Sequence, residues 1–421
     1  MAPLPEPSPD ALHHSRELAR LIHREIAAAG GWIAFSRYME LALYAPGLGY
    51  YSAGAAKFGA AGDFVTAPEL SPLFGRTLAR QVAQVLELTG GEVLELGAGS
   101  GRLALDLLRE LERLGTLPVR YHILEVSADL RERQRALIGE AAPHLLERVA
   151  WLDTLPASFT GITLGNEVLD AMPAALVRWR EDAVYERGVA SAGDEFQWSE
   201  RPLAPGPLLD AARALKLPAG YLSEINLAAA ALVASLARRL QSGALLLIDY
   251  GFGESEYYHP QRSQGTLMCH YRHHAHADPF FLPGLQDITA HADFSRIARA
   301  GTAGGLELLG YATQAAFLIN CGITQLLSET PVEDVSTYLP LTNQAQRLLS
   351  PAEMGELFKV IALGKGIDEP LVGFAGGIGG IACRPPGSES VSRAGTAKDK
   401  VQLPEPSASP LPPGGACDKT R

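Results

Sequence analysis

The chain has 421 residues, enough for a sizeable core and for two or three domains or one enlarged α/β domain. Its formal charge is −11, from 36 Lys plus Arg against 47 Asp plus Glu, which excludes a protein that binds nucleic-acid backbones through a general positive charge. The 43 glycines and 29 prolines are too few and too irregularly spaced for a fibrous chain.

The cysteines, the apolar runs and the N-terminus indicate the compartment. Cys269, Cys321, Cys383 and Cys417 lie far apart with no C-x-x-C pair, which is typical of a reducing compartment and argues against a zinc knuckle. The longest apolar runs fall well short of the roughly eighteen residues that a membrane-spanning helix needs. Residues 1–10 contain four prolines and no basic residue, unlike a secretory signal or transit peptide. We expect a bacterial cytoplasmic protein without a membrane span.

The N-terminal region is predicted to be helical, between disordered ends of the chain. Residues 1–11 and 385–421 are rich in Pro and Ser and carry too little apolar surface to offset the entropy of ordering. Residues 44–68 are rich in Gly and aromatic residues without a steady period, which predicts a long loop. The apolar spacing predicts helices over 12–28, 35–43 and 69–88. We interpret 12–88 as a helical extension that includes a cofactor lid.

Residues 89–384 alternate strands with helices, which predicts right-handed crossovers and a parallel sheet. Insertions are expected at about 174–222, with a hairpin, and at about 251–310. The expected strands are 93–96, 119–125, 148–152, 162–165 and 243–249, then late strands near 311–318, 359–363 and 380–383; the hairpin strands are 175–180 and 183–190. The expected helices are 103–114, 128–138 and 225–240.

A glycine-rich turn follows the first strand and opens a helix. Such a turn offers backbone N–H groups and the positive end of a helix dipole to a nucleotide-like ligand. The spacing is G-x-G-x-G, at Gly97, Gly99 and Gly101. A dinucleotide fold needs a third glycine where this chain has Arg102, and Glu95 just before the turn suits an amino group or a sulfonium better than a pyrophosphate. The turn therefore favours S-adenosylmethionine over NAD.

Two further acids follow strands of the predicted sheet. Glu125 ends the second strand, at about the spacing at which an acid accepts hydrogen bonds from both ribose hydroxyls. Asp153 follows the third strand and is expected to meet the adenine amino group. For Asp153 a helix N-cap or a solvated loop acid is an equally open alternative.

Six short blocks occur in order between residues 12 and 385. They are GDFVTAPE at 62–69, ELGAGSG at 95–101, GNEVLDAMP at 165–173, SEIN at 223–226, DYG at 249–251 and QDITAHADF at 286–294. Together they resemble the MidA family of S-adenosylmethionine-dependent methyltransferases, whose mitochondrial members act as complex I assembly factors by dimethylating an arginine of a peripheral-arm subunit. The position read here as Ala67 is frequently Ser in that family, and the Pro-rich tail lies outside its pattern.

The resemblance implies the fold class, the cofactor and the activity. It implies an α/β class I methyltransferase fold, a Rossmann-like, seven-stranded and mostly parallel sheet with a helical N-terminal extension and substrate-binding insertions. The implied cofactor is S-adenosyl-L-methionine, and the implied reaction is protein arginine N-methylation, with dimethylation expected. The expected partner is a protein that presents an arginine; nucleic acid is not expected, and a homodimer stays open. Eukaryotic relatives are expected in the mitochondrial matrix.

An arginine substrate would need carboxylates, because its cationic guanidinium must approach a second cation. Glu167, at the end of the fourth strand, is the expected main ligand of the guanidinium, with Asp170 beside it. Glu224 is a candidate second carboxylate, Asp249 could position the substrate, and His291 could accept a proton. The alternatives are that Glu167, Asp170 and Glu224 stabilise helix N-termini and that Asp249 is a buried acid satisfied by backbone N–H groups.

The remaining site predictions concern a lid and a histidine group. Gly62, Asp63 and Thr66 are expected to close over the cofactor, with a structural turn as the alternative, and Asn166 is expected to contact the cofactor. The histidines at 270–276 come with no H-E-x-x-H motif or cysteine partner, so we expect a solvated or substrate-facing loop and no metal site.

Two rival functions stay open at this point. One is an NAD-dependent oxidoreductase, which Arg102 disfavours. The other is a non-catalytic assembly factor that keeps a cofactor pocket for stability; the intact Glu95, glycine turn and Glu167 argue for activity without proving it.

Overall fold

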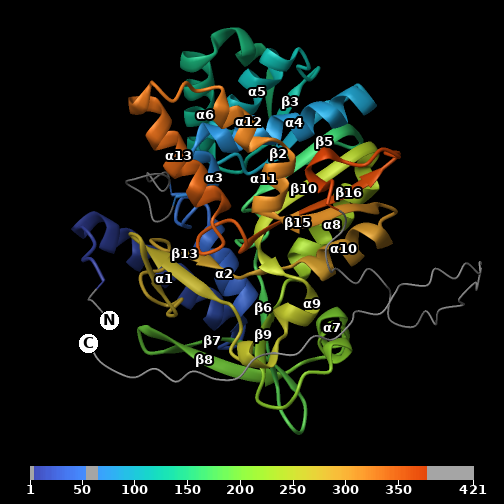
Figure 1. Cartoon of the computed structure of the whole chain (residues 1–421). Helices are drawn as coiled ribbons and strands as arrows, with labels where there is room; N and C mark the ends of the chain where they lie inside the picture. The colour runs from blue at the N-terminus through green and yellow to red at the C-terminus, as the bar shows by residue number, and fades with distance from the viewer. Residues whose placement is uncertain (1–3, 54–64, 377–421) are drawn as a thin grey trace, which may run out of the picture. The chain divides into compact units, whose positions relative to one another are not determined.

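The structure, a computed structural model, describes residues 4–53 and 65–376 (Figure 1). Its centre is a sheet with the strand order β15-β16-β10-β5-β2-β3-β4. The five strands from β10 to β4 pair in parallel, and β16 pairs antiparallel with both β10 and β15. These strands are β2 (Glu92–Leu96), β3 (Tyr121–Leu124), β4 (Val149–Leu152), β5 (Phe159–Asn166), β10 (Leu240–Phe252), β15 (Glu307–Thr313) and β16 (Phe358–Lys365). The predicted class I methyltransferase sheet is confirmed.

The central sheet is buried on both faces, which explains its nearly continuous apolar strands. In β10, Leu246 and Ile248 pack into one apolar core, and Leu245 and Leu247 pack into the core on the other face. The first core is covered by α4 (Pro72–Thr89), α5 (Arg102–Leu114), α11 (Gln314–Asn320), α12 (Ile323–Ser328) and α13 (Val335–Leu349). The second is covered by α8 (Leu227–Arg239) and α10 (Phe294–Ala303).

The predicted helix over 69–88 is two helices, so that prediction is wrong in its start. α3 (Ala67–Leu70) ends at Ser71, whose extended backbone and side chain begin α4: Ser71 Oγ accepts a hydrogen bond from the Leu73 amide at 3.2 Å. Pro72 stands at the first position of α4, where its missing N–H costs nothing. The Ser-Pro pair was the sequence signal for this boundary.

The N-terminal extension is helical, as predicted, but it starts earlier. α1 (Pro9–Ala28) begins after Ser8, whose side chain accepts from the Ala11 amide, so residues 9–11 are not part of a disordered end. α2 (Phe35–Tyr44) matches the predicted second helix. Both helices pack on an antiparallel sheet through an apolar cluster that includes Ile22, Tyr38 and Val189.

The first insertion supplies most of this five-stranded antiparallel sheet, which is larger than the hairpin expected, and the N-terminal extension supplies β1. Its order is β1-β7-β6-β9, with β8 on the outer side of β7. The strands are β1 (Ile33–Ala34), β6 (Ala175–Trp179), β7 (Val184–Ala192), β8 (Glu195–Pro202) and β9 (Leu222–Ile225), and α7 (Pro207–Leu215) precedes β9. The predicted helix 225–240 was wrong at its start, because Ile225 ends β9 and Asn226 caps α8.

The second insertion holds a small three-stranded sheet of order β12-β11-β13. Its strands are β11 (Met268–Tyr271), β12 (His274–His276) and β13 (Asp287–Thr289); α9 (Glu254–Tyr257) precedes them, and β14 (Ala292–Asp293), which pairs with the end of β10, follows.

Of the late predicted strands, 359–363 lies within β16, whereas 311–318 is half wrong because α11 begins at Gln314. Thr313 Oγ1 accepts from the Ala316 amide and starts that helix. α6 (Ala128–Ala141) extends the predicted helix 128–138. The predicted strand 380–383 and the predicted tail at 385–421 lie outside the described residues. Among the described residues, no helix is both long and apolar enough to cross a membrane.

Candidate functional site

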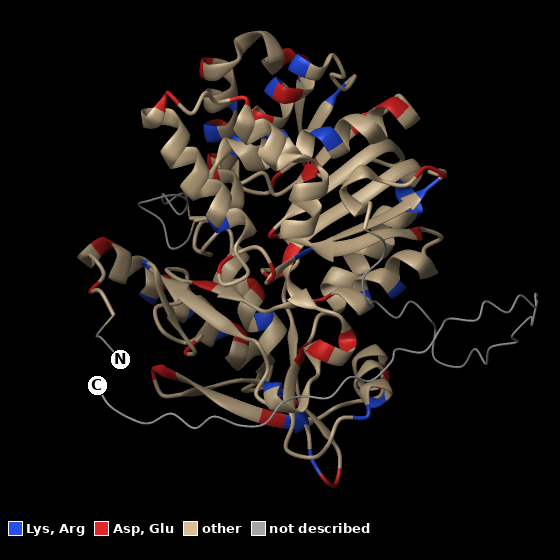
Figure 2. Ribbon diagram, in the orientation of Figure 1, with Lys and Arg blue, Asp and Glu red and all other residues tan. Residues whose placement is uncertain are grey.

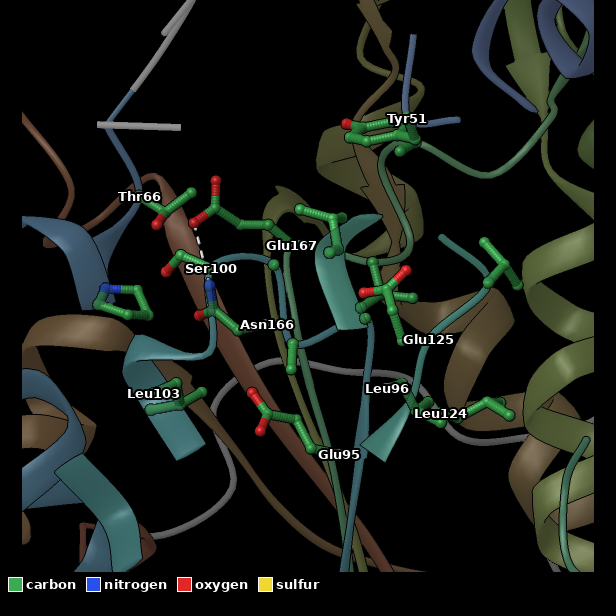
Figure 3. Close-up of a pocket in the computed structure, with 18 of the residues that line it drawn as sticks. Tyr51, Thr66, Glu95, Leu96, Ser100, Leu103, Leu124, Glu125, Asn166 and Glu167 are labelled. Carbon is green, nitrogen blue, oxygen red and sulfur yellow. Dashed lines mark hydrogen bonds between the residues drawn. The ribbon is translucent and has the colours of Figure 1, made fainter. Parts of the chain in front are cut away.

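A pocket of about 250 Å³ opens at the carboxyl ends of β2, β3 and β5 (Figure 3). This is the edge of an open parallel sheet where ligands bind in α/β proteins. Its walls are the glycine turn after β2, the end of β3, the turn after β5, and the N-terminal segments that carry Tyr44, Tyr51 and Thr66. Figure 2 shows several acidic segments in the middle of the view, between the central sheet and the antiparallel sheet.

The glycine turn is folded as its spacing predicts. Gly97 and Gly99 line the pocket with φ values of 59° and 55°, in the left-handed region that favours glycine. Gly101, with φ 87°, is the N-cap of α5 and does not line the pocket. A Cβ atom on Gly101 would lie 3.1 Å from the side chain of Gln134, so this glycine allows the turn to pack against α6.

Glu95 lies at the bottom of the pocket and is buried. Its Oε2 atom accepts a hydrogen bond of 2.7 Å from the hydroxyl of Tyr121. Burial raises the pKa of Glu95 to about 7, the Tyr121 hydrogen bond lowers it, and the charge of Glu125 raises it further. A cation bound beside Glu95 would therefore stabilise its ionised form.

Glu125 joins the end of β3 to the glycine turn. Its Oε1 atom accepts from the Ser127 amide at 3.0 Å, and its Oε2 atom accepts from Gln134 Nε2 at 3.2 Å. Gln134 Nε2 also donates to the Gly99 carbonyl at 2.9 Å. Burial raises the pKa of the Glu125 carboxyl. Glu125 lines the pocket, as expected of a ribose ligand.

Asp153 lies elsewhere. Its side chain is 86% exposed and forms an ion pair of 2.7 Å with Arg131. Asp153 does not line the pocket. Its position is that of a solvated loop acid, the alternative given above, and not that of an adenine contact.

The turn after β5 carries Asn166, Glu167 and Asp170 into the pocket. Glu167 has φ 53°, uncommon for a residue with a side chain, and its amide donates to the Ile248 carbonyl at 2.9 Å. Asn166 Nδ2 donates to Glu167 Oε1 at 3.0 Å, the contact drawn in Figure 3. Asn166 Oδ1 is buried and has no hydrogen-bond partner among the described residues. It is an acceptor available to a ligand.

The carboxyl groups of this turn have raised pKa values. Burial, and then the charge of Asp170, raise the pKa of Glu167 to about 8, against the lowering effect of hydrogen bonds from Asn166 and the Ala67 amide. Burial raises the pKa of Asp170 to about 6, and hydrogen bonds from the Tyr250 hydroxyl and the Ala171 amide lower it. The Tyr250 hydroxyl lies 2.6 Å from Asp170 Oδ2. No helix follows Glu167 directly, so the helix-capping alternative does not apply to it.

Asp249 lies behind the pocket and does not line it. It is fully buried, and its Oδ2 atom accepts from the amides of Leu169 at 2.9 Å and Asp170 at 3.3 Å. Its Oδ1 atom accepts from the Tyr250 amide at 2.9 Å. Asp249 is thus a buried acid whose oxygens accept from backbone N–H groups, which was the alternative to a role in positioning the substrate. These hydrogen bonds fix the turn that carries Glu167.

Glu224 and His291 also lie outside the pocket. Glu224, in β9, accepts from the amide and hydroxyl of Thr266 and from the amide of Leu267, within 3.0–3.1 Å. It ties β9 to the second insertion rather than stabilising a helix N-terminus. The ring of His291 packs on Tyr250, and burial lowers the pKa of His291 to about 4, so this histidine is neutral near pH 7.

Of the predicted lid, Thr66 lines the pocket, and Gly62 and Asp63 lie outside the described residues. Sequence reasoning missed Glu69 and the two tyrosines. Glu69 accepts a hydrogen bond from Ser100 Oγ of the glycine turn. Its place in the GDFVTAPE block was a usable signal, whereas Tyr44 and Tyr51 lie in or beside a region without periodicity.

The pocket is strongly acidic. Five carboxyl groups line it, and no Lys or Arg belongs to the described lining residues. The five are Glu69, Glu95, Glu125, Glu167 and Asp170. This set fits a sulfonium nucleoside, whose positive charges the acids stabilise, and it opposes the pyrophosphate of NAD. The unpartnered Asn166 Oδ1 atom adds an acceptor for an N–H group of such a ligand.

Known proteins are similar to this chain in sequence and in fold. A family described as S-adenosyl-L-methionine-dependent methyltransferases matches residues 77–312, more than half of the chain. The mitochondrial protein arginine methyltransferase NDUFAF7 of Danio rerio is 31% identical over 80% of this chain and 84% of its own length. Its homologue from Drosophila melanogaster is 28% identical over 88% of this chain and 91% of its own length.

A solved structure gives a stronger match. A methyltransferase-type protein from Burkholderia thailandensis, bound to S-adenosyl-homocysteine, is 53% identical, covers 89% of this chain and 98% of its own, and superimposes with a TM-score of 0.87. These matches confirm the cofactor class and the resemblance found in the sequence. The chain belongs to the MidA family of S-adenosyl-L-methionine-dependent methyltransferases.

Proposed function

We propose that this protein transfers methyl groups from S-adenosyl-L-methionine to an arginine side chain of a protein substrate. The observation that supports this most is the pocket itself, lined by five carboxyl groups and, among its described lining residues, by no basic side chain. Such a pocket suits two cations that must meet, a sulfonium and a guanidinium. The name protein arginine methyltransferase, given to relatives at 28–31% identity, supports the same substrate class.

The cofactor would lie along the glycine turn. In this proposal Glu125 accepts hydrogen bonds from the ribose hydroxyls, and Glu95 and Asn166 Oδ1 stabilise the amino-acid end of the cofactor. Thr66 would cover the ligand. Bound S-adenosylmethionine would supply an electrophilic methyl group.

The substrate guanidinium would be held by Glu167 and Asp170. A guanidinium donates in a fixed fork, so two neighbouring carboxylates both bind it and fix the direction of the nitrogen that reacts. Methylation replaces one N–H bond by an N–C bond and releases one proton. The sulfonium and the guanidinium would favour the ionised form of Glu167 over the protonated form that its raised pKa favours in the empty pocket, and the ionised form would accept that proton. Asp249 acts as a positioning residue, because it holds the backbone of the turn.

The partner we propose is a protein substrate in the cytoplasm of a bacterium. Cys269 and Cys321 are both free and buried, which suits a reducing compartment. A non-catalytic assembly role is the rival, and it would require binding of the cofactor without transfer of its methyl group.

The test uses the full chain, tritium-labelled methyl donor and a lysate from a strain that lacks this protein. After acid hydrolysis, the label should appear in methylated arginine. Glu167→Gln should lower the rate about a hundredfold while affinity for S-adenosyl-homocysteine stays within about threefold. Glu195→Gln, on exposed strand β8, is the matched control and should behave as wild type. Label found only in lysine or in small molecules, or no transfer despite tight binding, would contradict the proposal.

A further inference from the structure

Two tyrosines form part of the pocket wall opposite the glycine turn. Tyr44 ends α2 and Tyr51 lies in the segment that follows it, and both line the pocket. Their rings stack, with centroids 5.5 Å apart and planes inclined by 23°. The ring of Tyr50, which is buried, packs against Tyr51 in a T-shaped arrangement with the ring centroids 5.0 Å apart.

Both hydroxyl groups are committed to acceptors. The Tyr44 hydroxyl donates to the Ala171 carbonyl at 3.0 Å, and the Tyr51 hydroxyl donates to Asp287 Oδ1 at 3.0 Å. Ala171 follows Asp170 on the turn that also carries Glu167, so the first bond ties the tyrosine pair to that turn. The rings are thus fixed in place, and Figure 3 shows Tyr51 across the cavity from Glu167.

The two rings are neutral and lie near carboxyl groups. Burial raises the pKa of both phenols, and the charges of Asp287 and Asp170 raise them further, so neither tyrosine ionises near neutral pH. An aromatic face carries negative potential and attracts a cation laid on it. A wall of this kind beside carboxylates favours a flat, delocalised cation, which can stack and donate hydrogen bonds at once. A compact ammonium group, which is strongly hydrated, gains less from it.

We propose that the Tyr44–Tyr51 pair is the surface against which the substrate guanidinium packs, and that it makes the pocket select arginine over lysine. This inference rests on the proposed function and deepens it. Glu167 and Asp170 would hold the edge of the guanidinium while the tyrosines cover its face. The pair would determine the specificity of the pocket, because the charge of the carboxylates attracts arginine and lysine side chains alike.

The test is a binding titration of the full chain loaded with S-adenosyl-homocysteine. The three probes are acetyl-arginine amide, acetyl-lysine amide and acetyl-citrulline amide, which is flat like arginine but neutral. Wild type should bind the arginine probe at least tenfold more tightly than either of the others. Tyr51→Leu should remove about tenfold of that affinity, and Tyr51→Phe, which keeps the ring, should lose threefold or less. Tyr185→Phe, at a half-buried position of β7 that does not line the pocket, is the control.

Three results would overturn the inference. The first is that wild type binds the arginine and lysine probes with equal affinity. The second is that both Tyr51→Leu and Tyr44→Leu bind the arginine probe as tightly as wild type. The third is that Tyr51→Leu loses tenfold of its affinity for S-adenosyl-homocysteine. The last result would assign the rings to the nucleoside. Thermal melting of each variant verifies folding, and the comparison of the arginine and lysine probes on wild type keeps the test valid should the leucine variants unfold. Arginine selectivity in binding without methylarginine in the lysate assay would instead contradict the proposed function.

Discussion

The half-buried Glu167, in the turn after β5, and the buried Glu224, in β9, differ in how many hydrogen-bond donors surround the carboxyl group. Glu224 accepts from two backbone amides and from the hydroxyl of Thr266, with the Tyr257 hydroxyl at 3.3 Å as a further donor. Glu167 accepts from Asn166 Nδ2 and the Ala67 amide. Glu95, in the same pocket as Glu167, has the single donor Tyr121 among the hydrogen bonds described for it.

The difference separates structural acids from ligand-binding acids. A carboxylate has about four lone-pair positions, and a buried one is stable when donors fill them. Glu224 is satisfied by its own chain, whereas Glu95 and Glu167 keep acceptor capacity that only a ligand can use. Their raised pKa values express the same deficit, because burial without sufficient donors disfavours the charged form.

The largest expected effect is the difference in methyl-transfer activity between variants of Glu167 and of Glu224. Glu167→Gln should lower kcat/KM for methyl transfer about a hundredfold, equivalent to about 2.7 kcal/mol of transition-state stabilisation. Glu224→Gln should leave kcat/KM, calculated per folded molecule, within about threefold of wild type. Steady-state kinetics of the two variants side by side measures the contrast. Equal losses in both would remove the distinction between the two classes of acid.

Stability should change in the opposite sense. Glu224→Gln turns an NH₂ group toward backbone donors and should lower the free energy of unfolding by about 2 kcal/mol. Glu167→Gln should not destabilise the fold at pH 7, because it removes a poorly satisfied carboxyl group. Urea unfolding of both variants at pH 7 tests this prediction, and a stable Glu224→Gln protein would speak against it.

The pH dependence follows from the raised pKa of Glu167. Its pKa is about 8 in the folded chain against an ordinary value of 4.5, so between these values the folded state binds more protons than the unfolded state. The contribution of this group to stability therefore falls as pH rises through that window. Glu167→Gln should be more stable than wild type by about 1–2 kcal/mol at pH 9, after allowance for partial solvent screening, with no gain below pH 4.5.

Urea unfolding across this pH range measures that gain. The same ionisation should make kcat/KM of wild type rise with pH toward 8, since the charged form binds the guanidinium. A gain that is constant with pH would mean that Glu167 titrates normally.

The smallest expected effect concerns Asp153. Because its side chain is 86% exposed and paired with Arg131, Asp153→Asn should change affinity for S-adenosyl-homocysteine less than twofold. Glu125→Gln, at the position proposed to bind the ribose, should weaken the same affinity about tenfold. Isothermal titration of both variants compares them, and a strong loss in Asp153→Asn would return this acid to the site.

Much of the site could be predicted because it is local in sequence. Glu95, Gly97, Glu125 and Glu167 each lie at or directly after a strand of a parallel sheet, and all such ends meet at one edge. The sheet itself follows from apolar strands that alternate with helices. The residues at the ends of the strands can therefore be assigned to the site from the sequence alone.

The errors come from contacts between distant segments. Glu224 is satisfied by Thr266 and Leu267, more than forty residues away, and nothing near Glu224 in the sequence announces them. Tyr44 and Tyr51 are held at the pocket by hydrogen bonds to Ala171 and Asp287. The spacing of apolar residues in the sequence gives no sign of these contacts. The start of α8 was within reach, since Asn226 caps it by accepting from the Ala229 amide at 2.9 Å.

The most direct test is a proton count on binding. Calorimetric titration of S-adenosylmethionine and of S-adenosyl-homocysteine, near pH 7.5 in buffers of different ionisation enthalpy, measures protons released per ligand. We expect both ligands to bind and the sulfonium to release more protons, because its charge lowers the pKa values of Glu95 and Glu167. The excess should shrink in Glu167→Gln. Equal proton release by the two ligands in wild type, or no binding of either, would contradict an acid pocket built to bind cations.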